Sequence, residues 1–324
     1  MTEEIHKNIY RIEVGLPNSP LKTLNAYLIK GSKGDYLIDT GYRADECLNC
    51  LQSGLDELGC NKDRLNVILT HMHTDHTGLF DKICGREGSI FMSKTDHLYG
   101  KEYEKGVLHR LTLKRMYESG LKENEKLSSD SLEALAGDFF DPRFTDLNDQ
   151  DEIDTGEYKL RAILTPGHTP GHMVYYIEDE GIAFIGDNVL YGITPNITVF
   201  PNTQNSLGDY LSSLEMLKNI KVRYAFPSHR RIDGDYYSRI DELKTHHIKR
   251  LEEITLIIRE ESDITPYEIA SRMKWKIRYD DWEHFPNTQK WFAIGECNSH
   301  LDYLEHEGII GFQTEDGIRK YYLK

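Results

Sequence analysis

The chain has 324 residues and a formal charge of −15, from 39 basic and 54 acidic side chains. This length suggests about two domains, and such acidity repels nucleic acid and anionic membranes at long range. With 29% charged residues, 39% hydrophobic residues and no apolar run near the roughly 18 residues of a membrane span, the composition predicts a soluble globular protein.

The N-terminus and the cysteines together predict a cytoplasmic location. Residues 1–6 do not form a basic segment followed by an apolar stretch, so no cleaved signal is expected. Five scattered cysteines argue against a disulfide framework. Cys47 and Cys50 have redox or zinc-site spacing, but apolar residues recur at helical spacing over residues 44–59, so we interpret them as part of a buried helix face.

The first 240 residues alternate short apolar strands with helices. The strands are expected at residues 9–14, 24–29, 36–38, 66–69, 89–92, 159–164, 173–177, 182–185 and 222–226. Helical periodicity is found at residues 44–59 and 207–219. Residues 30–35 form a hairpin-like turn, so part of the sheet should be antiparallel. Mixed hairpins and helices predict sheets covered by helices.

Residues 95–150 interrupt this alternation of strands and helices. Helices are expected at residues 108–119 and 129–135, and residues 137–151 are polar and rich in turn formers. We interpret this segment as a helical insertion in a first domain that spans residues 1–236.

Residues 237–324 predict a second, winged-helix-like domain. A long helix is expected at residues 237–261, a second begins at Thr265-Pro266, and a third runs over residues 287–307. Residues 308–323 then predict a closing β-hairpin around a turn at 314–317.

A dense group of possible metal ligands follows the predicted strand at residues 66–69. His71, His73, Asp75 and His76 lie within six residues. Imidazole and carboxylate groups at this spacing are the ligands of a transition-metal site.

Three further loops place similar side chains at the ends of predicted strands. His168 and His172 follow residues 159–164, Asp187 follows residues 182–185, and His229 follows residues 222–226. Because loops at strand ends meet at one edge of a sheet, a single shared site is the simplest explanation.

Asp39-Thr40-Gly41, after another predicted strand, completes a series of motifs. With the 71–76 segment, His168, Asp187 and His229, it resembles the five motifs of the metallo-β-lactamase-fold superfamily. The resemblance covers roughly residues 5–233, and residues 167–172 are most similar to the glyoxalase II-like branch. It implies an α/β (α+β) fold, an αββα sandwich of two mixed sheets with metals at one edge.

The resemblance also implies roles for the candidate ligands. A first divalent metal would be held by His71, His73 and His168, and a second by Asp75, His76 and His229, with Asp187 bridging. Zinc is the expected metal, and iron or manganese are the alternatives. A metal-bridging hydroxide would attack the substrate, Asp75 would also orient that hydroxide, and Asp39 would support the histidines.

The C-terminal residues resemble the winged-helix appendage of the LACTB2-like branch, some members of which cut RNA. Arg272, Lys274, Lys276 and Arg278 form a basic strip, but the region as a whole is acidic, which disfavours nucleic acid without excluding it. The three tryptophans, all in this region, predict a small core or a docking face for the rest of the chain or a second copy of it, so a homodimer stays open.

We therefore expect a binuclear metallohydrolase that acts on a small-molecule ester, thioester or lactone, with the insertion and its Tyr99, Tyr103 and Tyr117 roofing the pocket. A metal-dependent endoribonuclease is the alternative function. A binding module with a vestigial site is a third, and the complete ligand set argues against it.

Overall fold

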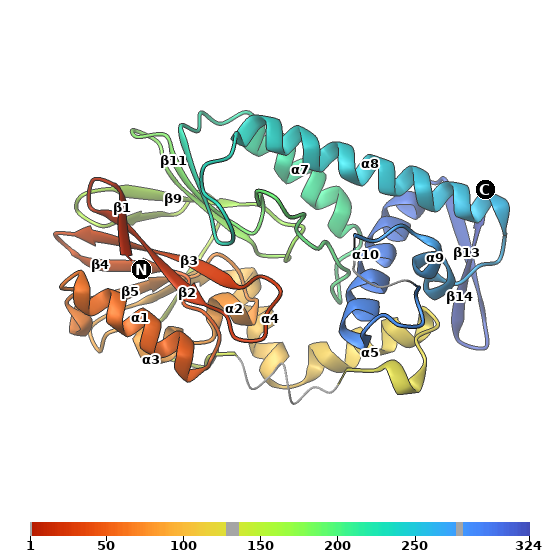
Figure 1. Ribbon diagram of the computed structural model, residues 1–324, viewed down its shortest axis with the longest axis horizontal. Coiled ribbons are helices and arrows are strands. Elements are labelled where there is room, and N and C mark those ends of the chain that lie inside the picture. The colour runs from red at the N-terminus through yellow and green to blue at the C-terminus, as the bar shows by residue number, and fades with distance from the viewer. Residues whose placement is uncertain (1, 128–135, 277–280) are drawn as a thin grey trace.

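Two β-sheets pack face to face between layers of helices in the computed structural model, which describes residues 2–127, 136–276 and 281–324 (Figure 1). The apolar faces of the two sheets meet in a core that includes Tyr27, Phe184 and Phe226. The predicted fold class is confirmed, since two mixed sheets covered by helices form the α/β sandwich that the motifs implied.

The first sheet has seven strands in sequence order. They are β1 (Thr2–His6), β2 (Ile9–Gly15), β3 (Thr23–Gly31), β4 (Gly34–Ile38), β5 (Leu65–Ile68), β6 (Ile90–Ser93) and β7 (Phe144–Leu147). Strands β1 to β4 pair antiparallel, and β4 to β7 pair parallel. The β3–β4 hairpin confirms the turn expected at residues 30–35.

The second sheet has five strands in the order β12-β11-β10-β9-β8. They are β8 (Glu152–Asp154), β9 (Lys159–Leu164), β10 (Met173–Ile177), β11 (Ile182–Gly186) and β12 (Tyr224–Pro227). Only the β11–β12 pair is parallel. The loops after β9, β11 and β12 therefore carry residues to the edge that also receives the loops after β4 and β5.

Helices cover the outer face of each sheet. The first sheet is covered by α1 (Asp45–Glu57) and α3 (Phe80–Ile83), and the second by α7 (Ser206–Lys218) and the start of α8 (Tyr236–Glu260). The short α2 (Thr74–Thr77) follows β5, and one-turn 3₁₀ helices lie at η1 (Lys62–Arg64) and η2 (Glu123–Glu125). Cys47 is buried on α1 and the five cysteines are free, as expected from their spacing.

The region from 95 to 150 contains helices and one strand of the first sheet. Helix α5 (Val107–Glu118) was expected, whereas α4 (Lys94–Glu104), β7 and β8 were not. The helix expected at residues 129–135 lies outside the described residues. Strand β7 pairs with β6, so the core sheet resumes inside the segment that we interpreted as an insertion.

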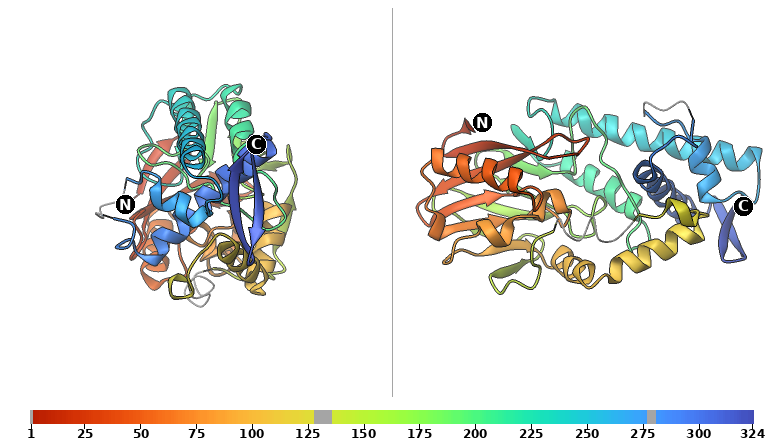
Figure 2. Two further views of the ribbon diagram at one scale, coloured as in Figure 1. Left: turned by 90° about the vertical axis from the view of Figure 1, so that its right-hand side faces the viewer. Right: turned by 60° about the horizontal axis from the view of Figure 1, so that its bottom comes forward.

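The C-terminal residues form α9 (Pro266–Arg272), α10 (Asn287–His306) and a hairpin of β13 (Ile310–Glu315) and β14 (Ile318–Leu323). Thr265 caps α9 and Pro266 opens it, as predicted. Helix α10 lies between α8 and α5 (Figures 1 and 2), and all three contribute to one core with Met116, Ile254 and Ile294. The winged-helix assignment stays a prediction.

No helix in the described part of the chain has the length and apolarity that a membrane crossing requires.

Candidate metal centre

The structure brings all seven predicted ligands together at one edge of the sandwich. They form three overlapping groups whose ligand atoms lie within 4.8 Å of one another: His71, His73 and His168; His71, His76 and Asp187; and Asp75, His76 and His229. Parallel pairing of β4 with β5 places Asp39 beside the segment that begins at Thr70. Loops from both sheets therefore build one site, as the strand-end positions predicted.

The first triad is closely spaced. His71 Nε2 and His73 Nδ1 are 3.0 Å apart, and the His168 ring centroid lies 4.6 Å from that of His73. His71 is fully buried and His168 is almost so, whereas His73 is partly exposed. His73 therefore lies on the side from which a substrate can enter.

The second triad lies on the other side of Asp187. His229 Nε2 is 3.3 Å from His76 Nε2 and 3.3 Å from Asp75 Oδ2. One oxygen of Asp187 is 3.5 Å from His229 Nε2, and its other oxygen is 3.7 Å from His168 Nε2. Asp187 thus faces both triads, as a bridging carboxylate would.

Hydrogen bonds on the outer side of the imidazoles fix which nitrogen faces inward. His168 Nδ1–H donates to the carbonyl of Asn196 (2.9 Å), and His229 Nδ1–H donates to that of Thr23 (2.8 Å). His76 Nδ1–H donates to the carboxylate of Asp39 (2.8 Å). In each ring Nε2 therefore faces the cluster, where a metal would take the place of its proton, the arrangement that metal-binding histidines adopt.

Asp39 is fully buried and organises this outer layer. It accepts hydrogen bonds from the backbone N–H of Thr70 (2.9 Å), from the Thr70 hydroxyl and from the Ser228 hydroxyl (2.9 Å), besides that from His76. Its φ of 59° is in the left-handed region, which non-glycine residues adopt at some cost, often at functional sites. The role expected for Asp39, support of the histidines, fits these contacts.

The charge balance of the site fits a cation. Burial alone would lower the pKa of His76, but Asp39, Asp75 and Asp187 outweigh it and raise that pKa well above its usual value. Burial would raise the pKa of Asp75, but His76 and His229 lower it to about 2. Asp75 and Asp187, whose pKa is also lowered by His229 and His76 against the effect of burial, are therefore ionised and attract positive charge.

Other atoms of the cluster also fit the binding of a cation. Burial and the neighbouring His168 lower the pKa of His73 to about 3, so its ring is neutral and has a lone pair for a metal. His168 Nε2 and Asp187 Oδ1 are buried without a hydrogen-bond partner. Because an unpartnered buried polar atom is costly, these atoms fit the coordination of a divalent metal.

His172 has a different role from its neighbour His168. Its Nδ1–H donates to the Thr165 hydroxyl (2.8 Å), and its Nε2 accepts from the backbone N–H of Asp187 (3.1 Å). Both ring nitrogens are used, so His172 organises the loop rather than facing the cluster.

The histidines of the other regions lie apart from the centre. His97 is buried between Asp146 (2.5 Å) and the Phe139 carbonyl (3.0 Å). His247 on α8 bonds to His300 on α10 (3.0 Å).

Of the three tyrosines expected to roof the site, Tyr99 lies near it. Its hydroxyl donates to the Pro201 carbonyl (2.6 Å), and its ring lies 6.2 Å from that of Phe200. Tyr103 packs against the core under the first sheet, and Tyr117 bonds to Glu123 and packs against the C-terminal core.

Three residues that matter here were not singled out from the sequence: Asp96, Asn196 and Phe200. Asp96 stands three residues after Ser93, whose side chain caps α4, so a capping pattern could have placed it on a helix. Asn196 and Phe200 lie in an irregular segment that gives no periodic signal.

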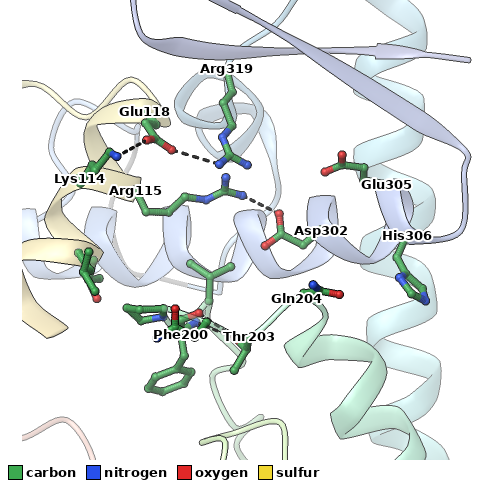
Figure 3. A pocket seen from close by; sticks show the side chains of 15 residues that line it. Lys114, Arg115, Glu118, Phe200, Thr203, Gln204, Asp302, Glu305, His306 and Arg319 are labelled. Carbon is green, nitrogen blue, oxygen red and sulfur yellow. Dashed lines mark hydrogen bonds and ion pairs between the residues drawn. The ribbon is translucent and has the colours of Figure 1, made fainter. Parts of the chain in front are cut away.

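A pocket of about 560 Å³ has Phe200 in its wall and is lined by none of the seven candidate ligands. Its walls come from α5, α10, β14 and residues 199–204. Two ion pairs lie side by side in it: Arg115 with Asp302 (2.6 Å) and Arg319 with Glu118 (3.2 Å) (Figure 3). The Phe200 ring points away from these ions in Figure 3 and stacks 6.5 Å from the ring of His73, so Phe200 separates pocket and centre.

Comparison with known proteins agrees with this geometry. The model of the metallo-beta-lactamase superfamily matches residues 22–229. A beta-lactamase-like protein 2 homolog of Caenorhabditis elegans is 26% identical over 263 residues, 80% of this chain and 74% of that protein. An atrochrysone carboxyl ACP thioesterase of Aspergillus fumigatus is 25% identical over 234 residues, 72% of this chain but 44% of that protein.

A solved structure of a metallo-beta-lactamase family protein from Thermus thermophilus superposes with a TM-score of 0.83 at 26% identity, covering 98% of this chain and 99% of the other. Since the family model spans well over half of the sequence, the chain belongs to the metallo-β-lactamase superfamily.

Proposed function

We propose that this chain is a binuclear metallohydrolase that cleaves a small-molecule thioester, ester or lactone. The observation that carries the proposal is the position of Asp187, whose two oxygens face His168 of one triad and His229 of the other. A single metal would need only one triad, so the complete second triad supports two metals.

The residues at the edge would divide into two metal sites. His71, His73 and His168 would hold one divalent metal, Asp75, His76 and His229 the other, and Asp187 would contact both. Zinc suits imidazole and carboxylate ligands, and iron and manganese are the alternatives. When bound, such metals supply a Lewis acid for the scissile carbonyl and an activated water.

The chain's own groups would orient the reactants. Asp75 is buried and ionised, so its carboxylate accepts a hydrogen bond from the attacking water and holds it toward the carbonyl. Asp39 keeps His76 in the tautomer that presents Nε2 to the site.

We favour a thioester among the possible substrates. A relative of this chain is named a thioesterase, and the pocket behind Phe200 has room for a part of the substrate remote from the reacting carbonyl. Its lining is mainly polar and charged, with Leu111 and Val199 among the few apolar residues, which suits a substrate segment that carries polar groups.

RNA is the less favoured substrate because two cations of the C-terminal region are engaged by carboxylates. Lys290 on α10 is buried and bonded to Glu125 (2.6 Å). Arg272 of the basic strip pairs with Glu261 (2.7 Å), and Arg278 lies outside the described residues. One of the three described cations of the strip is therefore neutralised, which weakens its attraction for a phosphate backbone.

A panel of substrates tests this proposal. Purified protein loaded with zinc is assayed against a thioester, an ester, a lactone and single-stranded RNA. We expect thioester hydrolysis with the largest kcat/KM, unchanged when Arg272 and Lys274 are both replaced by Glu. RNA cleavage that falls in this double variant, with no hydrolysis of the small substrates, would establish the endoribonuclease instead.

A further inference from the structure

A buried carboxylate outside the ligand set joins the two loops that carry the first triad. Asp96, on α4, has none of its surface exposed. Its Oδ2 accepts from the backbone N–H of Met72 (2.9 Å) and from the hydroxyl of Thr169 (2.6 Å). Its Oδ1 accepts from the backbone N–H of Gly171 (2.5 Å).

The donors on these loops are immediate neighbours of the candidate ligands. Met72 lies between His71 and His73, and Thr169 directly follows His168. One carboxylate thus holds the backbone of both loops, although they are separated by almost one hundred residues of sequence. Any shift of either loop relative to Asp96 would change the spacing among the three imidazoles.

The contact is too close for any residue other than glycine at position 171. A Cβ atom there would lie 2.4 Å from the Asp96 nitrogen and 2.6 Å from its Oδ1. Distances below about 3 Å are not tolerated between such atoms, so the loop can approach the carboxylate only at a glycine. The contact therefore depends on both the carboxylate of Asp96 and the glycine at position 171.

The hydrogen-bond partners of Asp96 indicate that it holds the ligand loops rather than its own helix. In the described chain, Asp96 has three hydrogen-bond donors and no ion-pair partner. Simple stabilisation of α4 needs no buried charge, because the Ser93 side chain already caps that helix. A buried charge is costly unless several donors satisfy it, and here the donors come from the ligand loops.

We propose that Asp96 is a positioning residue for the metal centre, which fixes the distance between the His71–His73 segment and His168. This inference rests on the proposed metal function, since it assigns Asp96 a role in the geometry of the first triad. Residues that orient metal ligands in this way typically change metal affinity about 10- to 100-fold when they are replaced.

Asp96→Asn is the sharpest variant because it keeps the size of the side chain. An amide has one acceptor oxygen, so in either orientation an NH₂ group faces an N–H or O–H donor on one of the two loops. Glu104→Gln is the matched control: Glu104 is on the same helix and accepts from the backbone N–H of Phe139 (3.2 Å), away from the ligand loops.

The test measures metal affinity rather than activity. Metal-free protein is titrated with zinc against a chelator and with cobalt by absorption spectroscopy, and the melting temperature of the metal-free form is recorded. For Asp96→Asn we expect one metal to bind about tenfold or more weakly with an altered cobalt spectrum. For Glu104→Gln we expect wild-type affinity and spectrum.

Unchanged affinity and spectrum in Asp96→Asn, with only a lower melting temperature, would overturn the inference and leave Asp96 a purely structural residue. If that variant does not fold, Thr169→Val decides: it removes one donor, and we expect a smaller loss of affinity in the same direction. Wild-type protein that binds no metal would instead refute the proposed function, so the two failures are distinguishable.

Discussion

Two groups of buried histidines in this molecule differ in what surrounds them. At the sheet edge, the fully buried His71, His76 and His229 lie close to Asp75 and Asp187. Between α8 and α10, His247 and His300 are equally buried and 3.0 Å apart. Burial of imidazoles is common to both, so burial alone does not define a metal site.

The direction of the hydrogen bonds distinguishes the two groups. His300 Nδ1–H donates to the Glu296 carbonyl (2.7 Å), so its Nε2 accepts from His247 Nδ1–H, and the bonds run in one line. At the sheet edge the Nδ1–H groups of His76, His168 and His229 point outward and their Nε2 atoms converge.

Charge separates the two groups as well. Burial, with Arg250 and His246 nearby, lowers the pKa of both His247 and His300. At the sheet edge, carboxylates instead raise the pKa of His76 against the effect of burial. The candidate metal centre is therefore distinguished by converging Nε2 atoms and neighbouring carboxylates, not by imidazoles alone.

The largest expected effect follows from removing the carboxylate between the triads. Asp187→Ala should lower the metal content from about two equivalents to one or fewer and reduce kcat/KM by about 10³-fold or more, because activation of water and of the carbonyl both depend on the metals. Metal analysis and steady-state kinetics measure the two effects. Full metal content in this variant would contradict the bridging position.

Removing the hydrogen bond between His247 and His300 should lower stability and leave metal binding unchanged. His300→Leu leaves the buried Nδ1–H of His247 without an acceptor, at a cost of about 1–3 kcal/mol in the free energy of unfolding. Urea denaturation measures this loss, and metal analysis should show unchanged content. A loss of metal in His300→Leu would show that the two groups are coupled.

The free energy of unfolding at acid pH should depend on the protonation of His247 and His300. Because the folded-state pKa of His300 is lowered to about 3 and that of His247 is also lowered, the unfolded state binds more protons below pH 6.5. Stability therefore falls as pH falls below 6.5, by about 2 kcal/mol at pH 5 for His300, and His247 contributes in the same direction.

Urea denaturation of metal-free protein at pH 7.5 and 5 measures this change. The double variant His247→Leu and His300→Leu is the comparison, and it should lose this part of the pH dependence. An identical pH dependence in the double variant and the wild type would show that the pair does not titrate on unfolding.

The smallest effect concerns the wall between the pocket and the centre. Phe200→Ala should raise KM for a thioester about tenfold, the effect of losing one aromatic contact, and leave metal content unchanged. Phe292→Ala, on the exposed face of α10, is the control and should have no effect. Equal KM values in both variants would place substrate binding elsewhere.

The ligands could be predicted from the sequence because their chemistry is local. His71, His73, Asp75 and His76 lie within one turn and loop, and each remaining ligand follows a strand with a clear apolar pattern. The helices α1, α5, α7, α8 and α10 were placed within one or two residues. Helices α1 and α8 each have a periodic apolar face, whereas α10 is buried on several sides.

What could not be predicted depends on contacts between distant parts of the chain. Strands β1, β7 and β8 are short edge strands with largely polar, exposed residues, so their sequences lack the apolar alternation of a strand. Asp96 bonds to Thr169 and Gly171, more than seventy residues away. Such a contact has no local pattern and becomes visible only in the fold.

Direct measurement of bound metal tests the proposed centre most decisively. Metal-free protein is titrated with zinc and the stoichiometry is determined for the wild type, for His71→Ala and for His300→Leu. We predict about two equivalents in the wild type and in His300→Leu, and a loss of metal in His71→Ala. No bound metal in the wild type, or an equal loss in both variants, would contradict the assignment of the sheet edge as a binuclear metal centre.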